Sequence, residues 1–228
     1  MPPVPWWAVF SAAALPVLLV IGWTVAAVRQ PPGYDPWGDT VSSLSSYGML
    51  DRQILIGCLA GLGVAHLVTA IGLRPVRTAA RLVYGLGGAA TVLVAAVPKV
   101  DAQTPRVHGV SAVVAFVALA AWPAVATLPL LRPGRTRHRQ DRLRHDRPAG
   151  AARPVADRPW VLRPVVGTAV SLVMLGLGLW LALQLPDGGW AGLAERLTAG
   201  TEALWPLIVV VTLFRRTRRR PSPARRAA

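Results

Sequence analysis

The chain has 228 residues, of which 53% are hydrophobic and 15% are charged, and its formal net charge is +15. This composition is too apolar for an ordinary soluble domain. The positive charge might suggest nucleic-acid binding, but the arginines lie between or after apolar stretches, without interleaved aromatic residues. We therefore expect a membrane protein that does not bind nucleic acid.

Six apolar stretches follow one another along the chain. A helix crosses the ~30 Å hydrocarbon core of a bilayer with roughly 20 residues, at ~1.5 Å per residue. The sixth stretch is the weakest, because Pro206 interrupts it; it reaches full length only if its helix begins earlier, within residues 192–200. No alternating pattern suggests a β-barrel, so the sequence predicts an all-α integral membrane bundle of six transmembrane helices. The predicted spans lie at about residues 6–28, 53–73, 80–97, 107–131, 161–185 and 199–214.

Most arginines fall in every second connection, at residues 73–81, in the loop 132–158 and in the tail 215–228. The positive-inside rule places these segments, and both termini, in the cytoplasm of a bacterial cell with the spans in its plasma membrane. The arginine-rich loop is predicted to be disordered, and it and the tail are expected to contact anionic lipid headgroups. A cleaved signal peptide is the alternative for the first stretch, but that stretch is too long and lacks a basic start.

The first outward connection is rich in hydroxyl side chains. Asp39, followed by Thr40 and Ser42, is typical of a cap that opens a short helix. Ser42, Ser45 and Ser46 would share one face of that helix. Two interpretations stay open, because the hydroxyls can satisfy their own backbone or form a polar lid over a cavity between the spans.

The other outward connections carry charged and titratable side chains. Asp101 and His108 can form a dyad with His108 as general base and Asp101 orienting it, or they can simply tie a loop to a helix end. Glu195 and Arg196 are adjacent, so they should point to different helix faces and find separate partners. We predict Asp39, Ser42 and Glu195 as ligand-binding residues, with Arg196 holding an anionic group such as phosphate.

Within the spans, His66 and Cys58 are the titratable groups expected well inside the membrane. An intramembrane histidine is a candidate functional residue, although a hydrogen bond between helices explains it more simply. Glycines in the second and third stretches indicate close helix approach. A zinc site with three histidines, as in membrane hydrolases, cannot be assembled from His66, His108 and the loop histidines, so we predict no metal and no cofactor.

Several of these short motifs follow one another along the chain in a recognisable order and spacing. They are Asp39-Thr-Val-Ser-Ser-Leu, then Pro98, Asp101 and His108-Gly, then Phe116, then Gly192-Leu-Ala-Glu195-Arg196-Leu and Trp205. Over roughly residues 10–215 the chain resembles the bacterial multi-pass membrane family catalogued as domain of unknown function 998. The resemblance implies a six-helix membrane protein without a settled activity. It also implies that Asp39, Ser42, Asp101, His108, Glu195 and Arg196 belong to a shared pattern.

These residues lead to three hypotheses for function. The first is an outward-facing polar pocket that binds or processes a lipid headgroup or a small polar ligand. The second is a non-catalytic accessory or scaffold subunit, and the third is a small-solute transporter that uses His66 and the glycine-rich helices. Convergence of the polar residues on one concave site favours the first hypothesis, whereas a cavity continuous with His66 favours transport. The sequence leaves the oligomeric state open.

Overall fold

The computed structural model describes residues 2–97, 105–127, 158–186 and 189–218, and all regular elements within these ranges are helical. Two short 3-10 helices, η1 and η3, lie beside six long α-helices. The elements in chain order are α1 (Trp6–Val28), η1 (Val41–Ser45), α2 (Arg52–Gly72), α3 (Thr78–Ala96), α4 (Arg106–Thr127), η3 (Trp160–Leu162), α6 (Pro164–Gln184) and α7 (Ala191–Arg218).

Each long helix has 19 to 28 residues and is apolar enough to cross a membrane. The prediction of an all-α membrane protein with six spanning helices is therefore confirmed. The last helix differs from its predicted span, because α7 begins at Ala191 instead of residue 199. Large apolar side chains such as Val165, Leu172 and Leu183 point outward from α6, as expected for a helix surface in contact with lipid tails.

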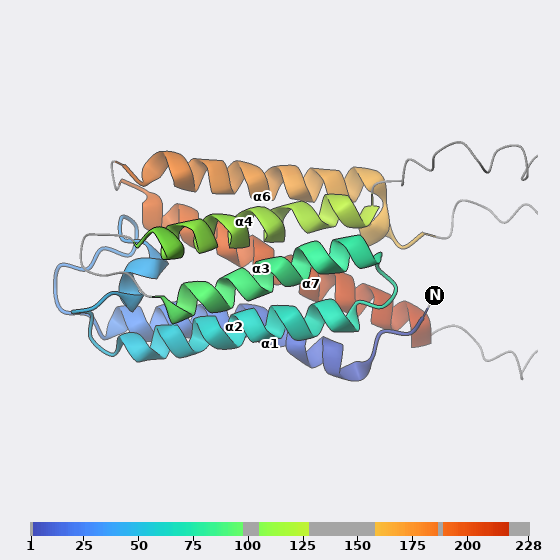
Figure 1. Cartoon of the computed structure of the whole chain (residues 1–228), viewed down its shortest axis with the longest axis horizontal. Helices are drawn as coiled ribbons and strands as arrows, with labels where there is room; N and C mark the ends of the chain where they lie inside the picture. The colour runs from blue at the N-terminus through green and yellow to red at the C-terminus, as the bar shows by residue number, and fades with distance from the viewer. Residues whose placement is uncertain (1, 98–104, 128–157, 187–188, 219–228) are drawn as a thin grey trace, which may run out of the picture.

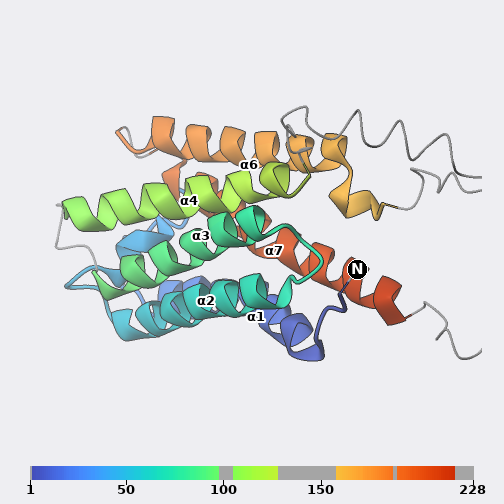
Figure 2. The same ribbon diagram turned by 45° about the vertical axis from the view of Figure 1, so that its right-hand side comes forward.

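The six helices form a closed ring. Consecutive helices are neighbours from α1 to α6, and α7 contacts both α1 and α6. Figure 1 shows α6, α4, α3, α2 and α1 in this order, with α7 behind them. Figure 2 shows that α7 crosses the bundle obliquely, so that it closes the ring from α6 at one end to α1 at the other.

The two ends of the bundle differ in chemistry. The end that carries residues 29–51, the start of α4 and the start of α7 is called the polar end here. The opposite end, called the arginine end, carries the N-terminus, the α2–α3 connection and the end of α7 with Arg215 and Arg216 (Figure 1). There, Arg81 donates to the carbonyls of Ala70 and Ile71, at 2.8 and 3.0 Å, and so caps the last turn of α2.

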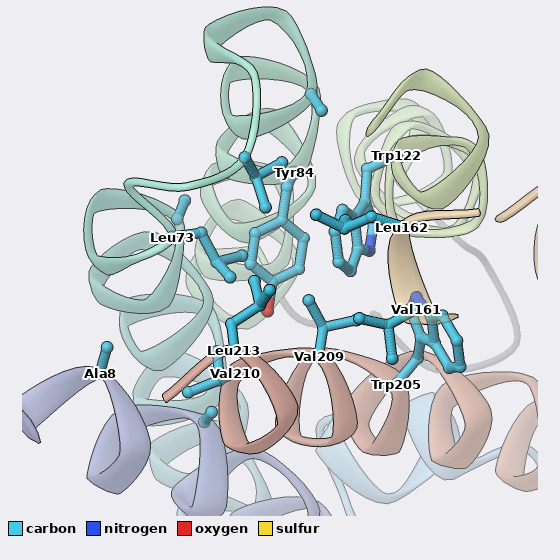
Figure 3. Packing of buried hydrophobic residues seen from close by; sticks show 14 of the residues in the cluster. Ala8, Leu73, Tyr84, Trp122, Val161, Leu162, Trp205, Val209, Val210 and Leu213 are labelled. Carbon is cyan, nitrogen blue, oxygen red and sulfur yellow. The ribbon is translucent and has the colours of Figure 1, made fainter. Parts of the chain in front are cut away.

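The main hydrophobic core lies toward the arginine end. Tyr84 of α3 and Trp122 of α4 have ring centroids 4.8 Å apart, and they face Val209 and Leu213 of α7 (Figure 3). The same cluster takes in Ala8 of α1, Leu73 after α2, and Val161 and Leu162 of η3. All six helices therefore meet in a packed apolar layer, which closes this half of the ring.

Glycines let α2 and α3 approach closely, as predicted. A Cβ atom on Gly63 would lie 2.7 Å from the amide nitrogen of Val92 and 2.8 Å from the carbonyl oxygen of Gly88. One on Gly88 would lie 2.8 Å from the Cβ of His66. Beside this contact, His66 Nδ1 and Tyr84 Oη form a buried hydrogen bond of 2.8 Å between the two helices. The interhelical role expected for His66 is thus confirmed.

Candidate functional site

The connection between α1 and α2 is fastened to the start of α7. The amides of Gly192 and Leu193 donate to the carbonyls of Gly38 and Trp37, each at 3.1 Å. These amides belong to the first turn of a helix and have no partner within it, so the loop supplies what α7 lacks. The indole rings of Trp37 and Trp190 pack edge to face, with centroids 6.3 Å apart. This capping by a distant loop explains why the helix begins earlier than its apolar run.

Arg196 strengthens the same attachment. Its Nη1 donates to the carbonyl oxygens of Pro36 at 2.6 Å and Asp39 at 3.2 Å, and its Nη2 donates to the hydroxyl of Tyr34 at 2.6 Å. Burial raises the pKa of the Tyr34 phenol above its usual value of 10, although the Arg196 guanidinium acts in the opposite direction. The phenol therefore stays neutral at physiological pH. In the structure, the guanidinium of Arg196 thus donates to atoms of the loop and not to an anion.

The short helix η1 is held over the bundle by its cap and by α7. Its cap is Thr40, whose hydroxyl accepts from the amide of Ser43 at 3.3 Å. Asp39 was predicted within this cap, but its carboxylate instead accepts from the amide of Asp35 at 2.9 Å. The carboxylate of Glu195 accepts from the amide of Ser42, with both oxygens at 3.3 Å. Glu195 and Arg196 thus have separate partners, as their adjacency predicted.

Beneath this loop lies a central cavity of about 860 Å³. Every one of the six long helices contributes to its wall, together with residues 38–43. Leu119, Ala120 and Met174 belong both to the wall and to the main hydrophobic core, so the cavity ends on the packed layer at the arginine end. The ring of helices is therefore hollow toward the polar end and closed toward the other.

Polar side chains line the cavity at two levels. At the polar end of the cavity, called its mouth here, are residues of the loop and of the starts of α4 and α7, namely Asp39, Thr40, Ser42, Ser43, His108 and Glu195. Deeper in the bundle are His66 of α2, Thr91 of α3 and Glu202 of α7. Ala203 packs with Leu62 and Ala65 of α2, which places Glu202 and His66 at a similar depth.

Glu202 is the most unusual of these residues. It lies well inside α7, and its side chain is 2% exposed. In the part of the chain that the structure describes, its Oε1 atom has no hydrogen-bond partner. A buried carboxyl oxygen without a hydrogen-bond partner is costly inside a membrane, and an ionisable residue in such a place is a candidate for a binding or transport site.

The structure brings together four of the predicted site residues. Asp39, Ser42, His108 and Glu195 all line the cavity mouth. His108 is buried, and its Nδ1 lies 2.6 Å from the carbonyl oxygen of Val97. Arg196 is beside the mouth but outside the lining. Asp101, like most of the arginine-rich loop, lies outside the described residues, so its pairing with His108 stays a prediction.

The sequence reasoning missed Glu202 and Thr91. The predicted sixth span of 199–214 contains Glu202 but leaves Glu195 outside, so the sequence prediction does not connect the two acids. A helix that starts at Ala191 puts Glu195, Thr198 and Glu202 at spacings of three and seven residues, on one face. That spacing was the available signal, because it continues a buried polar stripe from the mouth into the bundle.

The fold and the cavity define the class of this molecule as a multi-pass membrane protein. A family model described as "Protein of unknown function (DUF998)" matches residues 12–146, which is more than half of the chain. The chain belongs to this family, as its motifs suggested. The match covers Asp39, Ser42 and His108, whereas Glu195, Arg196 and Glu202 lie beyond it. Neither the curated proteins nor the solved structures that were searched gave a match to the chain.

Proposed function

We propose that this protein binds an amphipathic small molecule or lipid in its central cavity, with the polar part of the ligand among the polar side chains of the lining. The observation that carries the proposal is one cavity with a polar mouth and largely apolar walls. Its volume of about 860 Å³ falls within the ~300–1,000 Å³ of small-molecule sites. A binding role needs no reaction, and a catalytic role for His108 with Asp101 stays a separate hypothesis.

The walls favour a ligand that comes from the membrane. Val113 of α4 and Leu179 of α6 line the cavity, yet they are 63% and 62% exposed on the outer surface of the bundle. Toward the arginine end the same two helices pack tightly, since a Cβ on Gly167 would lie 2.5 Å from the carbonyl oxygen of Pro123. The cavity thus borders the lipid-facing surface between α4 and α6, where a ligand with an apolar part can enter.

Transport is the second candidate function, and one observation favours it. The cavity is continuous from the mouth to His66, and the packed layer around Tyr84 and Trp122 closes it below. This is the arrangement expected of a transporter open to one side, which would have to open that layer to complete a cycle. An accessory subunit, in contrast, needs no such cavity.

Placing a large side chain in the cavity should weaken ligand binding without loss of the fold. Gly178 of α6 lines the cavity, and a Cβ there would meet only Thr198 Cγ2, at 4.0 Å. Gly178→Phe is expected to weaken saturable binding of octanol at least roughly tenfold, because the ring takes the ligand's place. Calorimetric titration of the protein in nanodiscs, with empty nanodiscs subtracted, measures the effect.

The matched control is Gly176→Phe on the same helix. Gly176 is exposed, and nothing lies within 4 Å of its added Cβ. This variant should bind octanol like the wild type. Equal loss of binding in both variants, or no saturable binding to the wild type, would contradict the proposed site.

We further propose that the polar end faces outward and that both termini are cytoplasmic, in the plasma membrane. In a Cys58→Ala background, a membrane-impermeant maleimide added to intact cells should label Pro32→Cys at the polar end. It should label Thr78→Cys at the arginine end only after the cells are lysed, since both positions are exposed. The reverse pattern would invert the topology. Contact of the arginine-rich segments with anionic lipid headgroups stays a prediction of the same orientation.

A further inference from the structure

We propose that the deep end of the cavity binds the protonated nitrogen of an amphipathic amine and that Glu202 is its anionic partner. This inference rests on the proposed binding function and adds to it the chemical class of the ligand. It starts from the buried carboxyl group, which is 2% exposed, lines the cavity and leaves Oε1 without a hydrogen-bond partner among the described residues.

The backbone at this point adds a second acceptor. In an α-helix the carbonyl of Glu202 would accept from the amide of residue 206, but that residue is Pro206 and has no amide hydrogen. Glu202 therefore carries a carboxylate oxygen and a main-chain oxygen that both lack their usual donors. An ammonium group offers donors together with the opposite charge, so it suits the unpaired carboxylate oxygen.

The charge of the whole lining points the same way. The described residues that form the wall include three carboxyl groups, those of Asp39, Glu195 and Glu202, and neither arginine nor lysine. Arg196, which lies beside the mouth and could pair with an anion, donates instead to the carbonyls of Pro36 and Asp39. An anionic headgroup would find no arginine or lysine side chain among the described residues of this wall.

The remaining wall selects for an apolar body on the amine. Leu59 and Leu62 of α2, Phe116 of α4 and Leu175 of α6 line the space around the polar groups. A cavity of about 860 Å³ is far larger than a bare metal ion needs. Among the described residues, no group of three or more His, Cys, Asp or Glu side chains could hold a metal ion. An alkyl or aryl ammonium fits both the charge and the volume.

Three probes of equal chain length test this inference. Octylammonium, octanol and octanoate are titrated at neutral pH into the full chain in nanodiscs of zwitterionic lipid, with empty nanodiscs subtracted. The wild type should bind octylammonium at least roughly tenfold tighter than octanol, and octanoate weakest. Glu202→Gln should reduce the ratio between octylammonium and octanol to about one while octanol still binds. Glu202→Asp should keep most of the preference.

The control variant is Asp51→Asn, which removes an exposed carboxylate at the polar end, paired with Arg29 outside the cavity. It should keep the full preference. Equal binding of octanol and octylammonium to the wild type, or a preference that survives Glu202→Gln, overturns the amine site and leaves the proposed function intact. Absence of saturable binding by all three probes overturns the proposed function as well. If the glutamine variant does not fold, octanoate decides, because wild-type binding of octanoate as tight as that of octylammonium also overturns the inference.

Discussion

Replacing Gly63 by alanine is expected to lower the free energy of unfolding by about 2 kcal/mol or more. The added methyl group would lie 2.7 Å from the amide nitrogen of Val92 and 2.8 Å from the carbonyl oxygen of Gly88. Both are backbone atoms, so relief requires α2 and α3 to move apart. That movement would also stretch the 2.8 Å bond between His66 and Tyr84. Unfolding in mixed micelles with increasing SDS, followed by circular dichroism, measures the loss.

The same helix offers a matched control for this substitution. Gly57 is exposed, and an added Cβ there meets nothing within 4 Å. Gly57→Ala should therefore leave stability unchanged or raise it by up to about 1 kcal/mol, because alanine favours the helix over glycine. Equal stability of the Gly63→Ala and Gly57→Ala variants would show that the close contact between the two helices does not exist.

Replacing Arg196 by lysine is expected to loosen the loop that covers the cavity mouth. One guanidinium reaches Pro36, Asp39 and Tyr34 together, whereas a single ammonium cannot span these acceptors. Loss of about 2 kcal/mol from charge-assisted hydrogen bonds corresponds to roughly thirtyfold faster local opening. Hydrogen–deuterium exchange should report it at the amides of Gly192 and Leu193, which bond to the loop.

An arginine at the same end of the bundle provides the control. Arg29 forms an ion pair with Asp51 at 3.5 Å, with both side chains more than half exposed. Exposed pairs contribute little to stability, so Arg29→Lys should leave exchange at the amides of Gly192 and Leu193 unchanged. If both lysine variants exchange alike, Arg196 does not hold the loop, and the assignment of its guanidinium to backbone carbonyls is wrong.

The two predictions concern different parts of the cavity. The contact between α2 and α3 positions His66 at the deep level of the cavity, and Arg196 positions the residues of its mouth. Ligand binding can depend on the contact between α2 and α3, and on the guanidinium of Arg196, without either of them touching the ligand. Variants at Gly63 should therefore alter stability first, and variants at Arg196 should alter access to the cavity first.

The number and type of the spanning helices followed from the sequence alone, because the length of an apolar run and its hydrophobicity are local properties. The sequence also predicted the close approach of α2 and α3, from their glycines. It predicted separate partners for Glu195 and Arg196, because adjacent residues point to different helix faces. Only the tertiary structure decided how the polar residues are used. Arg196 bonds to residues some 160 positions earlier, and no local pattern encodes such a contact. The start of α7 depends on the same docking, since loop carbonyls cap its first amides. With that start, Glu195 and Glu202 lie on one face of the same helix, and Glu202 lines a cavity to which all six helices contribute.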